Sequence, residues 1–201
     1  MAATRQTAAP LDHTSLNPSF QGANWLARRV RDGEIDVNPP YQRGKVWTLD
    51  QRVSLVESWM RGLPAGVVIL ADRCNKAWAT ANPGRDPYET GEALWACVDG
   101  KQRLTTAVAW FDSEFAVPAS WFPDDHVATA EDADDGLYVR HDSLTLKGQR
   151  FMERHCSLLV AETKDCATEA QEAAFYLLVN GGGTAQTADD MDNAARIANP
   201  R

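Results

Sequence analysis

The sequence predicts one compact domain of the α/β (α+β) class, in which a short mixed sheet is flanked by helices. Segments with helical spacing of apolar residues alternate with apolar runs that are too short for helices, and this order is typical of mixed folds. The chain has 201 residues, which is enough to bury one full core. We therefore expect a flexible leader at 1–19 and a single domain at 20–201, with an irregular acidic insertion near 112–150.

The first helices are predicted from capping residues and apolar spacing. Trp25, Leu26 and Val30 have helical spacing, and Gly33 lies where such a helix would end. Thr48, followed three residues later by Gln51, has the pattern of a capping box and opens a well-defined helix. We expect one apolar face on this helix, with Trp59 beside it. Its members are Leu49, Val53, Val56, Met60 and Leu63.

Short apolar runs predict four strands, at 34–37, 66–70, 94–98 and 157–161. Prolines and a glycine make 72–92 an irregular excursion between two of them. A helix follows the strand at 94–98, because apolar residues recur there at helical spacing. They are Leu104, Ala107, Val108 and Phe111.

Two helices are expected near the C-terminus. Thr168 repeats the capping-box pattern and opens a helix that runs to about Val179. Three glycines between Asn180 and Thr184 predict a loop, and Thr187 is expected to cap a last helix.

Charge and cysteine content restrict the function classes. The formal net charge is −8 and the pI is about 5.0, so nucleic acid would have to bind a local basic patch against the overall field. The four cysteines have no paired spacing, which disfavours a zinc site or a disulfide framework. The sequence begins without a signal peptide and has no run of membrane-spanning length, so we expect a cytoplasmic protein with no membrane partner.

The segment Asp99-Gly100-Lys101-Gln102-Arg103 is the most informative polar motif. It joins an apolar strand to an apolar-striped helix, so the N–H groups and positive end of the helix point at one place. Glycine allows a ligand close to the backbone, lysine and arginine offset phosphate charge, and Asp99 is suited to Mg²⁺. The alternative is an ordinary helix start with solvated cations.

Other motifs have a structural and a functional interpretation. Prolines hold the chain extended before Tyr41, Gln42 and Arg43, which would project these side chains into a cleft or form a packing corner with Trp47. Glu57 is either a catalytic base or the partner of Arg61 four residues later.

The segment 124–135 carries six carboxylates. It does not have the ligand register of a calcium loop, so a solvated acidic loop is expected.

Taken in order, these motifs resemble the DGQQR-type branch of the ParB/sulfiredoxin-like superfamily, which supplies the N-terminal module of GmrSD-type modification-dependent restriction systems. The motifs are Pro-Tyr-Gln-Arg with Trp47, the Leu-Val-Glu-Ser run at 55–58, the stretch from Val98 to Thr106, and Asn-Gly-Gly-Gly-Thr from Asn180. The resemblance covers about residues 20–198.

The resemblance implies a ParB-like fold that binds, and often hydrolyses, a nucleoside triphosphate with Mg²⁺ or Mn²⁺. It implies a catalytic set of Asp99, Gln102 and Arg103, with Asp99 at the metal. Glu57 is added as a candidate base from its place on the capped helix. The residues implied at the nucleotide are Gly100, Lys101, Thr105, Thr106, Tyr41, Gln42, Arg43 and Asn180.

Two departures from the family pattern are visible. Lys101 replaces the first glutamine of the usual motif, and the glycine-rich loop after Asn180 lacks the usual Thr-Gly-Gly-Thr-Pro-Leu. The DNA-cutting module of such systems is a separate one, so we expect this domain either to work with a partner chain or to have another use.

The sequence therefore predicts a nucleotide-binding enzyme that hydrolyses an NTP or transfers its phosphoryl group, in phage–host conflict or DNA modification. One alternative is a module that senses a nucleotide or binds a partner without turnover, in which the acidic segment mimics nucleic acid as a decoy. Another is a component of a nuclease that contacts modified DNA. Because related folds have different activities, the fold leaves these alternatives open.

Overall fold

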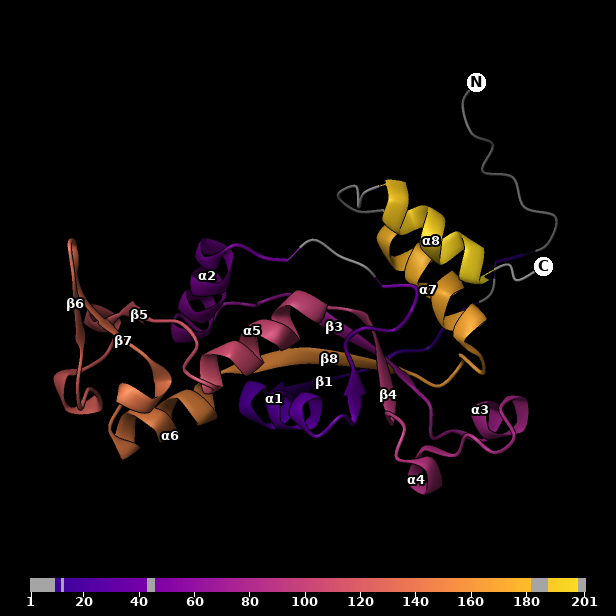
Figure 1. Ribbon diagram of the computed structural model, residues 1–201, viewed down its shortest axis with the longest axis horizontal. Helices are drawn as coiled ribbons and strands as arrows, with labels where there is room; N and C mark the ends of the chain where they lie inside the picture. Colours follow the sequence, from indigo (N-terminus) through magenta and orange to yellow (C-terminus); the bar gives the residue numbers. More distant parts are fainter. Residues whose placement is uncertain (1–9, 12, 43–45, 182–187, 199–201) are drawn as a thin grey trace.

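A computed structural model describes residues 10–11, 13–42, 46–181 and 188–198, although the side chains of 181–192 are not described. Figure 1 shows the arrangement of the elements. The helices are α1 (Ala23–Arg31), α2 (Leu49–Met60), α3 (Lys76–Ala81), α4 (Pro87–Thr90), α5 (Lys101–Phe111), α6 (Leu146–His155), α7 (Glu169–Gly181) and α8 (Ala188–Ala198). The strands are β1 (Asn17–Gly22), β2 (Ile35–Asp36), β3 (Val67–Asp72), β4 (Trp95–Asp99), β5 (Val117–Pro118), β6 (Glu131–Ala133), β7 (Gly136–Val139) and β8 (Ser157–Thr163).

The central sheet of the described chain has five strands in the order β1-β8-β3-β4-β2. The pairs β1–β8 and β3–β4 are antiparallel, whereas β3–β8 and β2–β4 are parallel. A second, antiparallel sheet with the order β5-β7-β6 lies at one end of the long axis of the molecule (Figure 1). The prediction of an α/β fold with a short mixed sheet is confirmed.

Both faces of the central sheet are covered, as the side chains of β3 show. Val68 and Leu70 point into one core cluster, which includes residues of α1, α2, α5 and α6. Ile69 and Ala71 point into a second cluster, which includes residues of α7 and α8. A sheet buried on both faces needs continuous apolar strands, which explains the unbroken apolar runs in the sequence.

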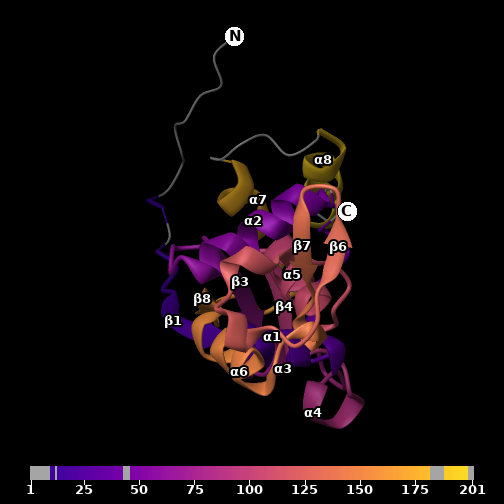
Figure 2. The same ribbon diagram turned by 90° about the vertical axis from the view of Figure 1, so that its left-hand side faces the viewer.

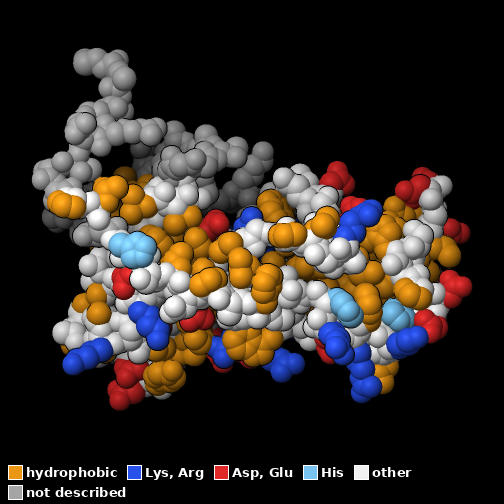
Figure 3. Space-filling model, turned by 180° about the vertical axis from the view of Figure 1, so that it is seen from behind, with side chains coloured by type: hydrophobic (Ala, Val, Ile, Leu, Met, Phe, Trp, Pro, Cys, Tyr) orange, Lys and Arg blue, Asp and Glu red, His pale blue; other side chains and the backbone are white. Residues whose placement is uncertain are grey.

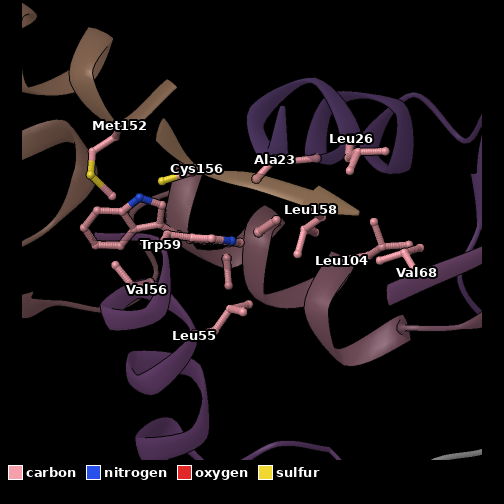
Figure 4. Close-up of a cluster of buried hydrophobic side chains, with 14 of the residues drawn as sticks. Ala23, Leu26, Leu55, Val56, Trp59, Val68, Leu104, Met152, Cys156 and Leu158 are labelled. Carbon is pink, nitrogen blue, oxygen red and sulfur yellow. The ribbon is translucent and has the colours of Figure 1, made fainter. Parts of the chain in front are cut away.

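Helix α2 forms as predicted but is rotated relative to the expected face. Thr48 and Gln51 form the capping box. The buried residues are Leu55, Val56 and Trp59, which point into the cluster with Leu104 of α5 and Met152 of α6 (Figure 4). The predicted face was wrong at its ends. Leu49 is 57% exposed because contacts with α5 and α6 set the rotation of the helix, and Leu63 is 55% exposed because the helix ends at Met60.

Two segments that were predicted to be irregular contain regular structure. The acidic insertion at 112–150 contains the β5-β7-β6 sheet, three short 3₁₀ turns and the start of α6. The excursion at 72–92 contains α3 and α4. The strands have two to four residues and α6 is mostly polar, so their apolar periodicity is too weak to be recognised in the sequence.

The start of the chain also differs from the prediction. Residues 17–19, which were assigned to the leader, are part of β1 and pair with β8. Pro18 is accommodated because β1 is an edge strand, where a missing N–H costs no sheet hydrogen bond. Within the described ranges, no helix combines the length and the hydrophobicity that crossing a membrane requires.

Candidate functional site

The polar motif forms the turn between β4 and α5, as the sequence predicted. Asp99 is the last residue of β4, and Gly100 is the N-cap residue of α5 with φ +93°. A Cβ on Gly100 would lie 2.9 Å from the Cα and 2.8 Å from Cγ2 of Val68 in β3. Glycine is therefore required here both for its backbone conformation and for the close packing of the turn on the sheet.

The segment 38–47 is hydrogen-bonded to this turn at three points. The Lys101 Nζ donates to Asn38 Oδ1 at 2.7 Å, and the Gln42 Nε2 donates to the Val98 carbonyl at 3.3 Å. The backbone N–H of Trp47 donates to Gln102 Oε1 at 3.0 Å. The two motifs that the sequence predicted to share a site are thus adjacent. Arg43 lies outside the described residues.

Arg103 contacts the start of β3 instead of projecting freely from the turn. Its Nε donates to the Ala65 carbonyl at 2.6 Å, and its Nη1 donates to the Val67 carbonyl at 3.3 Å. Gly66 has φ +80°, and a Cβ there would lie 2.5 Å from Arg103 Nη2. The Arg103 side chain is 25% exposed, and its Nη1 lies 3.8 Å from Asp99 Oδ2. Arg103 is therefore bonded to the chain at the start of β3, with Asp99 at ion-pair distance beside it.

The first turn of α5 is suited to an anion. It contains no acidic residue, whereas Lys101 stands at its first position. The first N–H groups of any α-helix have no partner within the helix, and the helix dipole places partial positive charge at this end. Gly100 itself is buried, and the Arg103 N–H already donates to the Gly100 carbonyl at 2.9 Å, so the N–H groups of Lys101 and Gln102 are the ones that a ligand could use.

Asp99 can hold a divalent cation only together with other ligands. Its side chain is 34% exposed, and the Gln42 Oε1 beside the turn is buried without a hydrogen-bond partner among the described residues. No cluster of three or more His, Cys, Asp or Glu side chains suited to a metal occurs in the described chain. One carboxylate fits Mg²⁺ or Mn²⁺ if phosphate oxygens and water complete the coordination, as is usual for Mg²⁺ bound with a nucleotide.

The other predicted site residues have different surroundings. Thr105 donates to the Gln102 carbonyl within α5, and Thr106 is fully buried. Glu57 forms an ion pair with Arg61, in which Arg61 Nη2 lies 2.7 Å from Glu57 Oε1. This pairing is the structural interpretation of Glu57 given above. The Asn180 side chain donates to the Tyr176 carbonyl.

Tyr41 belongs to a buried charged network. Its hydroxyl donates to Glu172 Oε2 at 3.2 Å, and burial raises the pKa of Tyr41 far above its usual value. Arg73 donates to both Glu172 oxygens, at 2.8 and 2.7 Å, and lies 3.7 Å from Asp36. Sequence reasoning missed this network, since Arg73 and Glu172 are 99 residues apart and neither lies in a motif. The role of Asn38 was also missed; its position before two prolines was the available signal.

A mixed sheet covered on both faces, with an Asp-Gly-Lys-Gln-Arg turn at the start of a helix, defines a DGQQR-type α/β domain. The family model described as the GmrSD restriction endonuclease, N-terminal domain, matches residues 26–195. The chain therefore belongs to this family of restriction-system domains, and its fold is consistent with the ParB-like superfamily. No curated protein and no solved structure matches the chain.

Proposed function

We propose that the domain binds a nucleoside triphosphate with Mg²⁺ or Mn²⁺ at the start of α5, and that it hydrolyses the NTP or transfers its phosphoryl group. Family membership supports a setting in DNA restriction or modification, where the domain would act with a DNA-cleaving partner. The observation that carries the proposal is the helix start itself. It has glycine at the cap, lysine at the first position and aspartate just before it, and it is held by the segment 38–47.

Each residue of the turn has a distinct role in the proposal. The N–H groups beside Gly100 and the Lys101 ammonium would bind phosphate oxygens. A bound Mg²⁺ would supply charge neutralisation for the phosphates. Asp99 would hold that ion or orient the nucleophile, and Arg103 would keep Asp99 in place through its contacts with β3.

Thermal-shift and phosphate-release measurements with ATP, GTP, CTP and UTP, each with and without Mg²⁺, test this proposal. A bound nucleotide stabilises the folded state by mass action, so at least one nucleotide should raise the melting temperature. Asp99→Asn should abolish the Mg²⁺-dependent part of the shift and the phosphate release. The matched control is Asp50→Asn, which changes an exposed aspartate in the first turn of α2 and should leave both unchanged. The absence of any shift with all four nucleotides would refute the proposal.

Nucleotide sensing without turnover is the second candidate, and one observation favours it. The Arg103 guanidinium is bonded to two backbone carbonyls, so it is less available to stabilise phosphate charge during a reaction. Lys101, which is bonded only to the Asn38 side chain, is then the cation of the turn that can contact a phosphate. A stabilising shift without phosphate release from any nucleotide would select this function over the enzymatic one.

A further inference from the structure

The small sheet ends in an open edge at the extremity of the molecule. Strand β6 pairs on one side with β7 and has no strand partner on its other side in the described chain. All three residues of β6 are exposed. Figure 1 shows the β6–β7 hairpin at one end of the long axis, away from α7 and α8, and in Figure 2 this end faces the viewer. An edge strand presents unpaired N–H and C=O groups, which can pair with a strand of another chain.

Beside this hairpin lies a groove with a volume of about 780 Å³. Its aromatic lining comes from the turn after β5 and from β7, namely Trp121, Phe122 and Tyr138, and Leu137 adds an apolar side chain that is 55% exposed. Two carboxylates, Asp124 and Asp135, also line it. The groove therefore offers apolar contact area together with negative charge, a combination that fits amphipathic cationic groups.

The negative charge around the groove is largely uncompensated. Of the six carboxylates between 124 and 135, Glu131 pairs with Arg140 and Asp125 pairs with Lys147. The remaining four have no ion pair with a described residue, although Asp135 accepts a hydrogen bond from the Tyr138 hydroxyl at 2.8 Å. They are Asp124, Asp132, Asp134 and Asp135. In the space-filling view, acidic side chains gather at this end of the molecule (Figure 3).

Two other ligand classes fit this surface poorly. The carboxylates do not converge on an ion, because no metal-suited cluster of three such groups exists in the described chain. Nucleic acid would be repelled by four unpaired carboxylates. A positively charged chain is attracted, and the attraction also accelerates its association.

We infer that this end of the molecule binds an extended, basic segment of a partner protein. The segment adds as a strand to the open edge of β6 with its lysine or arginine side chains beside the aspartates of the hairpin. The apolar groove on β7 and the turn after β5 lies next to this edge. The combination of an open edge, an apolar groove and four unpaired carboxylates matches strand addition, in which backbone pairing supplies affinity and alternate side chains supply specificity. The inference uses no residue of the nucleotide-binding proposal.

Fluorescence anisotropy with designed peptides tests the inference on the full chain. The probe is a labelled eight-residue peptide that alternates lysine with valine and leucine. Controls are a peptide of the same composition with its lysines in one block, and a peptide with glutamate in place of lysine. The alternating peptide should bind, with an affinity that falls as salt rises. The blocked peptide should bind at least about tenfold more weakly because it cannot present its charges on one side of a strand, and the glutamate peptide should not bind.

Charge-neutral variants assign the binding to this surface. The quadruple variant Asp124→Asn, Asp132→Asn, Asp134→Asn, Asp135→Asn should weaken binding of the alternating peptide about tenfold or more at low salt. The matched control removes four exposed carboxylates elsewhere and should bind like the wild type. It carries Asp32→Asn, Asp50→Asn, Glu89→Gln and Glu114→Gln.

Both quadruple variants must keep the wild-type melting curve. Leu137→Ser tests the groove a second time, because it removes an apolar side chain without changing the charge. Equal loss of affinity in the two quadruple variants would show that net charge alone attracts the peptide, and would overturn the inference. Equal affinity of the alternating and blocked peptides would overturn strand addition. The inference would also be contradicted if no peptide binds and if, instead, the chain self-associates in a way that the quadruple variant abolishes.

Discussion

The two ends of strand β4 carry polar clusters that differ in burial and in pairing. At one end, the Arg73 backbone is hydrogen-bonded to Leu94, and the Arg73 guanidinium is held by Glu172, whose side chain is 0% exposed. At the other end, Asp99 is 34% exposed, and the Arg103 guanidinium lies 3.8 Å from it. The first cluster satisfies its charges internally, whereas the second keeps a partly exposed carboxylate next to a helix start.

This difference separates a structural from a functional use of charge. A buried pair with two short hydrogen bonds balances its own charge, and removing one partner leaves an uncompensated buried charge. A half-exposed carboxylate with one long ion pair contributes little to stability and remains free to contact a ligand. Stability and ligand binding should therefore respond oppositely to mutation at the two ends.

The largest expected effect on stability is that of Glu172→Gln. This change leaves the Arg73 charge buried without its partner, and we expect the free energy of unfolding to fall by about 3 to 5 kcal/mol. Urea unfolding measures it. Glu57→Gln, which breaks the exposed pair with Arg61, is the control and should cost at most about 0.5 kcal/mol. Similar losses in the two variants would contradict the comparison.

Gly100→Ala should have the next largest effect and should act on both properties. The substitution places a Cβ against the Val68 backbone at positive φ, which we expect to cost about 1 to 3 kcal/mol. Nucleotide-induced stabilisation should also decrease because the turn must move. Gly33→Ala, also at positive φ but with nothing within 4 Å of its Cβ, separates backbone strain from the clash. If the two variants are equally stable, the turn is not packed as described.

Arg103→Lys tests whether this arginine positions the site. Lysine cannot reproduce the forked contacts with the Ala65 and Val67 carbonyls, so we expect a loss of about 1 to 2 kcal/mol. Nucleotide affinity should fall less than it does in Lys101→Ala, which removes a direct phosphate contact in the proposal. Titration of nucleotide binding by thermal shift compares the two. A larger affinity loss in Arg103→Lys would identify Arg103 as a direct ligand contact.

The smallest expected change in stability is that of Asp99→Asn. The ion pair with Arg103 is long and partly solvated, so we expect less than about 0.5 kcal/mol in urea unfolding. A loss above about 2 kcal/mol would show that Asp99 belongs with the structural charges.

Local sequence patterns predicted the elements whose determinants are local. The Thr48 cap, the strand before Asp99 and the turn at Gly100 depend on residues within a few positions of one another, and the structure has all three. Short elements in polar sequence, such as β6 and α4, were missed because two or three apolar positions define no period.

The candidate site was predictable as a set of motifs but not as a geometry. The order of the family motifs predicted that the segment 38–47 lies beside the turn. The hydrogen bonds that hold the two together, such as that from Lys101 to Asn38, join residues far apart in sequence and were not predictable. The partners of Arg103 are backbone carbonyls, which leave no residue-type signal.

By itself the sequence determined the mixed α/β class, the strand–glycine–helix turn and the family, because propensity, capping and motif order are properties of short segments. Only the tertiary structure decided which charged side chains are buried in ion pairs and which remain available to a ligand. Arg73 and Arg103 look alike in the sequence, but packing buries one against Glu172 and places the other on the start of β3 beside Asp99. The physical reason is that desolvation and pairing depend on what the fold brings near each charge, and those neighbours are distant in the chain.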